Sequence, residues 1–298
     1  MKSGFVSLIG RPNAGKSTLL NRLVGKKLAI VSPRPQTTRN RITGIRNLPD
    51  AQIVFVDTPG LHAGRGRLGQ LMQQTAVSAI EDVDVVCLLV DATSRRSRPD
   101  EVVLGPLQGY AGPVFCLLNK ADLVRPKERM LPLLETWRAA YPFREMLPIS
   151  AIDGTNCDRL LALLVDAMPE HPAYFPADVN TDQPETFYVA EIVREKVFHF
   201  TREEVPYAVA VRVDELNEQG GPKERLDIRA TIFVETDSQR GILVGKGGSM
   251  LKQIGTAARE DLEAFFGIKV FLGLTVAVRR HWRKDERALR EFGLRLTS

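Results

Sequence analysis

Cysteine is scarce in this 298-residue chain, and the three that occur, Cys87, Cys116 and Cys157, stand far apart. Their spacing matches no metal-binding pattern, and an odd number argues against a disulfide framework, so we expect buried thiols in a reducing cytosol. The chain also lacks any run of about 18 apolar residues, the length that a membrane span requires. Its first residues lack the apolar core of a signal peptide. We therefore expect a cytoplasmic protein.

A strong excess of either charge is missing too. Lysine and arginine number 41 against 36 aspartates and glutamates, which gives a net charge of +5. This mildly basic balance permits a polyanionic partner without requiring one. No internal repeat or low-complexity tract is present. The 44% of apolar residues suffices for two packed cores, and the length suggests two domains at about 150 residues each.

Residues 1–168 alternate short apolar strands with amphipathic helices. Several strands, such as Val85–Val90, are apolar on both faces, as in a parallel sheet that helices cover on each side. We therefore expect a doubly wound, mainly parallel α/β domain over 1–168. Strands are expected at 5–9, 41–46, 52–56, 83–90, 114–118 and 146–149, and helices near 16–24, 70–80, 100–109, 127–140 and 156–168.

Four prolines interrupt this alternation over residues 169–186, which predicts a semi-rigid linker. Tyr174 and Phe175 within it suggest partial docking. An α+β domain is expected over 187–298. Its predicted elements are a helix at 188–200, strands at 208–213 and 226–235, two helices around 245–248, a strand near 270–278 and a helix at 284–295.

The motif G-x-x-x-x-G-K-S lies between the first predicted strand and the first predicted helix, the context of a phosphate-binding loop. Glycines allow backbone N–H groups to surround a polyphosphate at the positive end of the helix. Lys16 would neutralise the β and γ phosphates, and Ser17 would hold Mg²⁺. An ordinary glycine-rich turn is the alternative. The predicted contacts are Gly10, Arg11, Pro12, Asn13, Ala14, Gly15, Lys16, Ser17 and Thr18.

Asp57-Thr58-Pro59-Gly60 ends another apolar strand. Asp57 would hold Mg²⁺ through water, and the Gly60 amide would sense the γ-phosphate; a turn or helix cap is the alternative use of such an aspartate. A threonine before this strand should bind Mg²⁺ through its hydroxyl and the γ-phosphate through its N–H. Thr38 is our choice and Thr37 the fallback, although the loop at 32–39 could also be merely polar and flexible.

Asn119-Lys120-Ala121-Asp122 follows a further strand and indicates guanine as the base. Asp122 can accept hydrogen bonds from N1–H and N2–H₂ of guanine, which adenine cannot supply. Asn119 would brace the loop and reach the base. After the next strand, Ser150, Ala151 and Ile152 would offer a backbone N–H to guanine O6. GTP and GDP are therefore the expected ligands.

Gly245-Lys246-Gly247-Gly248 is a G-x-x-G loop between two predicted helices. Followed by a strand, it indicates a KH domain, whose loop clamps about four single-stranded nucleotides; a plain helix–turn–helix corner is the alternative. Lys246 and Lys252 would contact phosphates. Ile242, Val244 and Ile254 would line the base groove, unless they belong to the core. Downstream, Arg279, Arg280 and their basic neighbours around Trp282 form either a phosphate-binding patch with a stacking ring or a solvated face.

Residues 1–168 resemble translation-factor-class GTPases. The whole chain resembles the Era family of bacterial GTPases. The resemblance is carried by the KH module and by the segments Gln36–Arg39, Tyr174–Pro176, Thr181–Gln183, Glu191–Lys196 and Glu204–Tyr207. The resemblance implies a GTP-switched protein that binds the 3′ end of 16S ribosomal RNA during maturation of the 30S subunit. It also implies a cytoplasmic monomer with some peripheral membrane association. The arginine-rich segment His62–Arg67 departs from the family pattern in being shorter.

Catalysis needs a further explanation, because Leu61 occupies the position where Ras-like enzymes carry a water-orienting glutamine. In related enzymes an asparagine at the Asn13 position coordinates K⁺, which implies K⁺-assisted hydrolysis by Lys16, Thr38, Gly60 and Asn13. Slow turnover until a partner supplies a catalytic group is the competing interpretation. Two other functions remain open: a scaffold that uses the nucleotide only structurally, and a GTPase that acts on tRNA or membranes.

Overall fold

The computed structural model describes residues 1–32, 34, 37–61, 66–94, 98–219 and 225–294. The chain divides into two compact units, and the division falls between Asp182 and Gln183. No helix among the described residues is long and apolar enough to cross a bilayer. Parts of the predicted switch loop (33, 35 and 36) and of the arginine-rich segment (62–65) lie outside the described residues.

The first unit is built on a six-stranded sheet in the order β2-β3-β1-β4-β5-β6. All neighbours pair in parallel except β2, which is antiparallel to β3. Strands β1, β3, β4 and β5 are apolar and nearly wholly buried, as expected for a sheet covered on both faces. The strands are β1 (Lys2–Gly10), β2 (Ile42–Leu48), β3 (Ala51–Asp57), β4 (Val85–Asp91), β5 (Val114–Asn119) and β6 (Glu145–Pro148).

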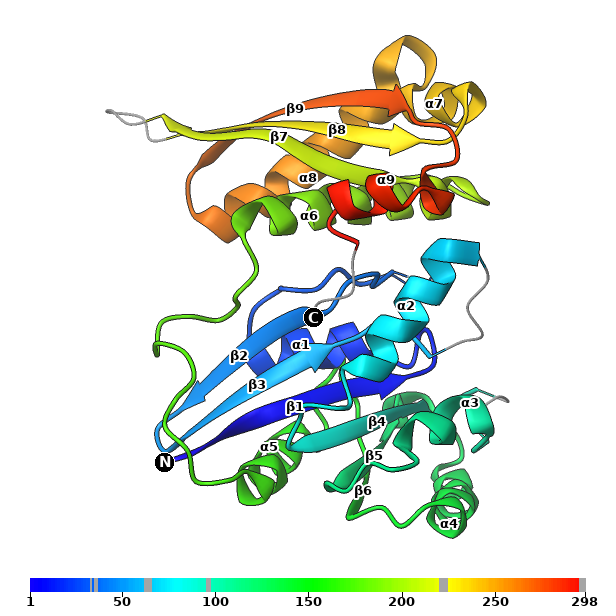
Figure 1. Ribbon diagram of the computed structural model, residues 1–298, viewed down its shortest axis with the longest axis vertical. Helices are drawn as coiled ribbons and strands as arrows, with labels where there is room; N and C mark the ends of the chain where they lie inside the picture. Colours follow the sequence, from blue (N-terminus) through cyan, green and yellow to red (C-terminus); the bar gives the residue numbers. More distant parts are fainter. Residues whose placement is uncertain (33, 35–36, 62–65, 95–97, 220–224, 295–298) are drawn as a thin grey trace. The chain divides into compact units, whose positions relative to one another are not determined.

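Helices cover both faces of this sheet (Figure 1). One face packs on α2, α3 and α4, which contribute Ala76, Val103 and the fully buried Trp137. The other carries α1 and α5. The α-helices are α1 (Lys16–Val24), α2 (Gly66–Ser78), α3 (Glu101–Leu104), α4 (Met130–Ala140) and α5 (Cys157–Ala167); short 3-10 turns are η1 (Gly105–Leu107), η2 (Ala121–Leu123) and η3 (Lys127–Arg129).

Residues 169–182 are held along the first unit. The buried side chain of Gln52 organises this contact: its Oε1 accepts from the N–H groups of Tyr174 and Phe175 at 2.8 and 3.0 Å, and its Nε2 donates to the Phe175 carbonyl at 2.8 Å. Further on, the Ile45 N–H donates to the Asn180 carbonyl at 2.7 Å. The segment thus runs beside β2, and the docking expected from Tyr174 and Phe175 is observed.

The second unit has a three-stranded sheet in the order β7-β8-β9, with β7 antiparallel and β9 parallel to β8. Its core joins one face of the sheet to α6 and α8 through residues such as Ile192, Ile228 and Ala258. Thr236 and Gln239 form a capping box that starts α7. The elements are α6 (Glu185–Phe200), η4 (Val205–Ala208), β7 (Ala210–Gln219), β8 (Arg225–Val234), α7 (Asp237–Val244), η5 (Lys246–Gly248), α8 (Ser249–Phe266), β9 (Lys269–Val278), η6 (Trp282–Lys284) and α9 (Glu286–Glu291).

The fold class expected from the sequence is confirmed, and the differences concern boundaries. Helix α6 begins at Glu185, inside the segment predicted as linker, directly after Pro184, whose extended backbone (φ −66°, ψ 152°) is the conformation of an N-cap residue. Helix α9 spans only Glu286–Glu291, since Gly293 has a φ of +72° just beyond its end. The helix expected at 100–109 is the short α3 followed by a 3-10 turn.

Candidate functional site

The turn from β1 to α1 depends on glycine at two positions. Gly10 has a φ of +147°, and a Cβ there would lie 2.3 Å from the Leu89 carbonyl oxygen. Gly15 has a φ of +99°, and its Cβ would collide with the Asn119 amide at 2.1 Å. The backbone therefore wraps closely enough for N–H groups to surround a bound phosphate chain.

A pocket opens at this turn. It joins the phosphate-binding loop to the predicted switch residues, so the structure brings these two parts of the predicted site together. The lining residues are Pro12, Asn13, Gly15, Lys16, Ser17, Thr18, Ile30, Val31, Ser32, Thr37, Thr38 and Gly60.

Lys16 is buried beneath the loop. Its Nζ donates to the carbonyl oxygens of Gly10 at 3.3 Å and Arg11 at 3.4 Å. Burial lowers the pKa of Lys16, and the nearby Asp57 carboxylate partly opposes this shift. The acceptors of these two hydrogen bonds are neutral carbonyl dipoles, and a phosphate anion would satisfy the charge of the ammonium far better.

Three side-chain oxygens meet beside Lys16. Ser17 Oγ donates to Asp57 Oδ2 at 2.5 Å and lies 2.8 Å from Thr38 Oγ1. Thr38 Oγ1 also lies 3.4 Å from Asp57 Oδ2. By contrast, Thr37 Oγ1 donates to the Arg34 carbonyl at 2.9 Å. This convergence favours Thr38 over Thr37 as the switch threonine.

The same cluster suits a hard divalent cation. Asp57 is fully buried, burial raises its pKa, and its Oδ1 has no hydrogen-bond partner within the described part of the chain. A carboxylate and two hydroxyls are the oxygen ligands that Mg²⁺ prefers. The orphaned carboxylate oxygen therefore fits a metal ion or one of its bound waters.

The loop after β3 is held tightly. Thr58 Oγ1 donates to the Leu8 carbonyl at 2.9 Å, and a Cβ on Gly60 would come within 2.6 Å of Pro12 N, so only glycine fits at that position. Leu61 is buried in the apolar core beside α2. Its side chain therefore offers no polar group to a water molecule. Asn13 is exposed at the pocket and has a φ of +64°, a backbone conformation that asparagine tolerates.

The predicted base-recognition loops are tied to the phosphate-binding loop through Asn119. Its Nδ2 donates to the Ala14 carbonyl at 2.7 Å, and its Oδ1 accepts from the Ala151 N–H at 3.0 Å. Lys120 Nζ donates to Asp91 Oδ2 at 2.7 Å. Burial alone would raise the pKa of Asp91, but hydrogen bonds from Lys120 and Thr93 lower it.

The ends of these loops differ in exposure. Asp122 is half-buried in η2, Ser150 is buried, and the Ile152 side chain is 68% exposed. Asn119 therefore braces the two loops, and Asp122, being half-buried, keeps part of its surface accessible.

A second cavity lies in the second unit, between the start of α8 and β9. Gly245, Gly247 and Gly248 all have positive φ, which allows the sharp turn before α8. The predicted Lys252 is one of the lining residues, and Ile242 is 45% exposed nearby in sequence on α7. The cavity is lined by Gly248, Leu251, Lys252, Gly255, Thr256, Arg259, Val270, Phe271, Leu272 and Leu274.

Sequence reasoning missed Arg259 in this groove and Phe271 at its β9 edge. Phe271 is 53% exposed although it is aromatic, and Arg225 Cζ lies 5.9 Å from its ring centroid. The alternation of β9 could have indicated its exposure: Val270 is buried against α8, so the Phe271 ring lies on the opposite face of the sheet, beside Arg225. Arg259 could have been found at helical spacing from Lys252.

Two predicted groove or stacking residues are core residues instead. Ile254 is fully buried with Ala258 and Leu262 on the inner face of α8, so it cannot contact a base. Trp282 is also fully buried, and its Nε1 donates to the Ala208 carbonyl at 2.9 Å. The prediction of a stacking surface at Trp282 was therefore wrong. An amphipathic ring with a backbone acceptor at hand is buried readily.

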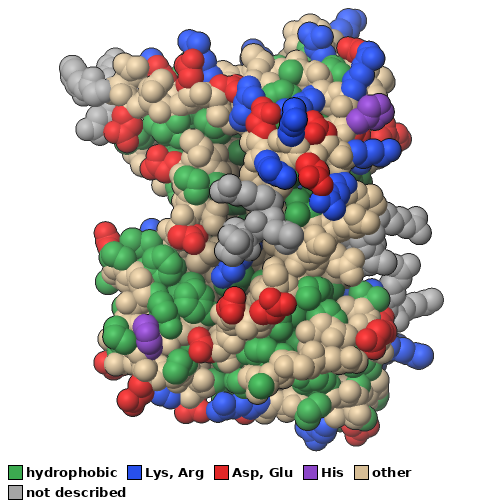
Figure 2. Space-filling view, in the orientation of Figure 1, with side chains coloured by type: hydrophobic (Ala, Val, Ile, Leu, Met, Phe, Trp, Pro, Cys, Tyr) green, Lys and Arg blue, Asp and Glu red, His purple; other side chains and the backbone are tan. Residues whose placement is uncertain are grey.

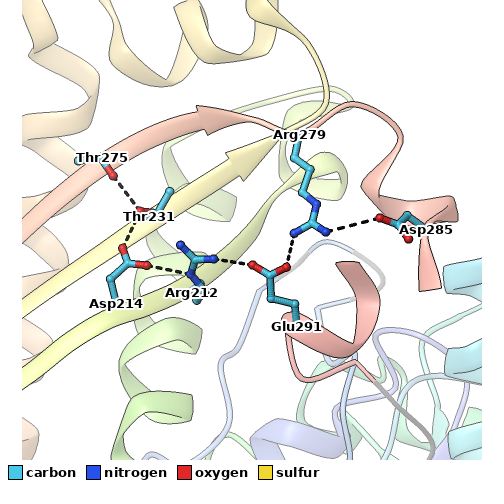
Figure 3. A network of polar contacts seen from close by, with 7 residues as sticks. All are labelled: Arg212, Asp214, Thr231, Thr275, Arg279, Asp285 and Glu291. Carbon is cyan, nitrogen blue, oxygen red and sulfur yellow. Dashed lines mark hydrogen bonds and ion pairs between the residues drawn. The ribbon is translucent and has the colours of Figure 1, made fainter. Parts of the chain in front are cut away.

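Ion pairs neutralise much of the basic cluster. Arg279 pairs with Glu291 at 2.5 Å and Asp285 at 3.5 Å, and Glu291 also pairs with Arg212 at 2.5 Å (Figure 3). Figure 2 shows acidic side chains among the basic ones on the visible face of this unit. Arg280 is different, because its side chain is 78% exposed and its contact with Asp237 is 3.9 Å long. Arg280 is thus the more available of the two predicted arginines.

Comparison with known proteins agrees with this architecture. Residues 5–120 match the family described as 50S ribosome-binding GTPase, and residues 204–283 match the KH domain family. The chain is 52% identical over 294 residues to the GTPase Era of Geobacter metallireducens, covering 98% of this chain and 97% of that protein. It is 50% identical to the GTPase Era of Geotalea daltonii, with the same coverage.

Two solved structures are similar over 99% of this chain and the whole of theirs, each with a TM-score of 0.93. One is Aquifex aeolicus Era Y63A bound to GDP·AlF₄⁻, at 38% identity. The other is Era in complex with MgGDPNP and nucleotides 1506–1542 of 16S ribosomal RNA, at 39% identity. A phosphate-binding loop joined to a KH module, together with relatives at half identity over nearly the full length, establishes that this chain is a GTPase of the Era family.

Proposed function

We propose that this GTPase uses GTP and GDP, with Mg²⁺, to control how its KH module binds the unpaired 3′ end of 16S ribosomal RNA during 30S assembly. The observation that carries the proposal is the solved relative that holds MgGDPNP and this RNA segment together. Both pockets of the present chain contain side chains suited to those ligands. Crosslinking in cells followed by sequencing of the bound RNA tests the proposal; recovery of tRNA in place of 16S RNA would contradict it.

The phosphate chemistry rests on residues from three elements. Backbone N–H groups of the loop at residues 10–18, other than Pro12, would cradle the phosphates, and Lys16 would neutralise the β and γ groups. Ser17, Thr38 and Asp57 would hold Mg²⁺, which when bound offsets negative charge on the phosphates. The Gly60 N–H and Thr38 would contact the γ-phosphate and so distinguish GTP from GDP.

Base selection rests on Asn119, Lys120, Asp122 and the loop Ser150–Ile152. The Asp122 carboxylate accepts from N1–H and N2–H₂ of guanine, and the aliphatic stem of Lys120 covers the base. Adenine presents an amino group in place of O6 and lacks the 2-amino group, so it would leave the carboxylate unpaired. Replacement of Asp122 by asparagine should shift preference from GDP toward XDP, measured by competition for a fluorescent GDP analogue.

Because no glutamine follows Gly60, another group must orient the attacking water or supply positive charge to the phosphates during hydrolysis. Asn13 stands exposed at the pocket rim, which suits it to coordinate K⁺ beside the phosphates. Multiple-turnover hydrolysis should fall when Na⁺ replaces K⁺, and Asn13→Ala should remove that difference. Turnover that is the same in both salts would eliminate this role and favour a partner-supplied group. No turnover at all, with or without RNA, would favour the scaffold function.

The RNA site is the groove between α8 and β9. Backbone groups of Gly245–Gly248 would clamp the sugar–phosphate chain, with Lys246 and Lys252 on phosphates. Ile242 and Val244 would border the bases, and Arg280 would add a phosphate contact. On the opposite face of β9, the exposed Phe271 ring offers a surface on which a base that leaves the groove can stack.

Coupling between the two activities has a route in the first unit. Thr38 precedes β2 in sequence, and β2 bonds to residues of the segment that leads into α6: Thr181 Oγ1 donates to the Thr43 carbonyl at 2.7 Å. A change in the switch loop would therefore alter the anchoring of the segment that carries the KH module. RNA affinity should differ between the GTP and GDP states, and equal affinities would refute the coupling because linkage requires a difference.

The family resemblance also leads us to propose that the protein is a cytoplasmic monomer that associates peripherally with the inner face of the membrane. Light scattering of the purified protein and flotation with lipid vesicles test these two points. A stable dimer would contradict the first, and absence from the vesicle fraction would contradict the second.

A further inference from the structure

Arg22 lies on α1, about 1.7 turns beyond Lys16, and reaches across to the loop after β6. Its Nε donates to the Ala151 carbonyl at 3.3 Å, and its guanidinium also donates to the Ile152 carbonyl. Gly154 lies against the same group, because a Cβ there would stand 3.7 Å from Arg22 Nη1. One planar cation therefore holds two successive carbonyls of the loop Ser150–Ile152.

The rest of that loop is anchored from other sides. The Ala151 N–H donates to Asn119 Oδ1, and Asn119 in turn donates to the Ala14 carbonyl of the phosphate-binding loop. Cys157 Sγ lies 3.7 Å from the Ser150 carbonyl oxygen. Because peptide units are planar, fixing the carbonyls of residues 151 and 152 also fixes the directions of the N–H groups of residues 152 and 153.

We propose that Arg22 is a positioning residue for base selection: through the Ala151 carbonyl it orients the Ile152 N–H toward O6 of guanine, while the Ser150 and Ala151 N–H groups donate to the Thr155 carbonyl and to Asn119 Oδ1. The proposal rests on the assignment of that loop to the base in the proposed function. Arg22 belongs to the helix that starts at the phosphates but makes these contacts at the base loop. It therefore affects recognition of the base and leaves recognition of the phosphates to Lys16 and Ser17.

The chemistry of the purine ring gives this role a distinct signature. Guanine and hypoxanthine carry an O6 acceptor, whereas 6-thioguanine carries sulfur, a weak acceptor, and keeps N1–H and the 2-amino group for Asp122. Loss of a well-oriented N–H should therefore weaken GDP and IDP together and change 6-thio-GDP little. A general loosening of the site would weaken all three ligands alike.

The test compares Arg22→Met, which keeps the length of the side chain, with Arg22→Lys and with Arg159→Met. Arg159 is an exposed arginine of the same unit, on α5. Affinities of the intact protein for GDP, IDP and 6-thio-GDP are measured by competition with a fluorescent GDP analogue. Arg22→Met should weaken GDP and IDP by about 3- to 10-fold, the value of one hydrogen bond, and 6-thio-GDP by less than about 2-fold. Arg22→Lys should restore part of the loss, and Arg159→Met should match the unmodified protein.

Two outcomes would overturn the role of Arg22: an equal loss for all three ligands, or no loss for any. A separate arm checks the assignment on which it rests. If Asp122→Asn leaves the preference for GDP over XDP unchanged, the base loops themselves are misassigned, whatever the Arg22 variants do.

Discussion

Phe271 offers the sharpest test of the RNA surface beside the groove. Its side chain is 53% exposed on the face of β9 that points away from α8, so Phe271→Ala removes little buried surface and should change the free energy of unfolding by less than about 1 kcal/mol. Loss of an aromatic surface under one base costs about 1–3 kcal/mol of binding. That corresponds to a Kd for RNA raised about 5- to 150-fold.

The assay is fluorescence anisotropy with a labelled single-stranded RNA that carries the 3′ end of 16S RNA, in the presence of a non-hydrolysable GTP analogue. Phe265→Ala is the matched control, because Phe265 is 37% exposed in the same unit and stacks on Tyr188 at a centroid distance of 3.7 Å. The control should keep its affinity. The reasoning is wrong if the Phe271→Ala variant keeps the free energy of unfolding of the unmodified protein and binds RNA as tightly as the control.

Three further predictions concern other parts of the chain. Trp282→Phe should lower the free energy of unfolding by about 1–3 kcal/mol, because the Ala208 carbonyl loses its buried donor. Chemical denaturation measures this change. A lower RNA affinity of the folded variant would instead support the stacking role that the buried position argues against. Thr38→Ala should slow GTP hydrolysis about 100-fold, whereas Thr37→Ala should change it less than about 3-fold; the reverse order would assign the switch to Thr37. Gln52→Ala should speed proteolytic cleavage at residues 174–182 with hydrolysis retained, and an unchanged cleavage rate would show that the segment is held by other contacts.

Much of the nucleotide site is visible in the sequence because its chemistry is local. A phosphate-binding loop needs glycine at fixed positions, and Gly10 and Gly15 occupy backbone conformations that the motif spacing already indicates. Asp57 and Asn119 each end a strand, so parallel pairing brings them to one edge of the sheet. Thr38 could not be separated from Thr37 by spacing, since the choice depends on which hydroxyl turns toward Asp57.

Features that depend on distant partners were harder to predict. Trp282 stands in a basic run typical of a surface, yet the Ala208 carbonyl, 74 residues earlier, accepts its N–H in the core. The sequence indicates that Arg279 can contact phosphate, but in the folded chain Glu291 and Asp285 form ion pairs with it. A run of charged residues in the sequence does not show which of them form ion pairs in the fold, and those ion pairs decide which charges remain available to bind a ligand.

The course of residues 169–182 beside β2 has a consequence for dissection of the protein. β2 is an edge strand of its sheet, and the docked segment occupies the Ile45 N–H and the Thr43 carbonyl that would otherwise be open to a neighbouring strand. Unprotected strand edges recruit other chains and aggregate. A fragment cut at Met168 should therefore self-associate, whereas one that continues to Asp182 should stay dispersed.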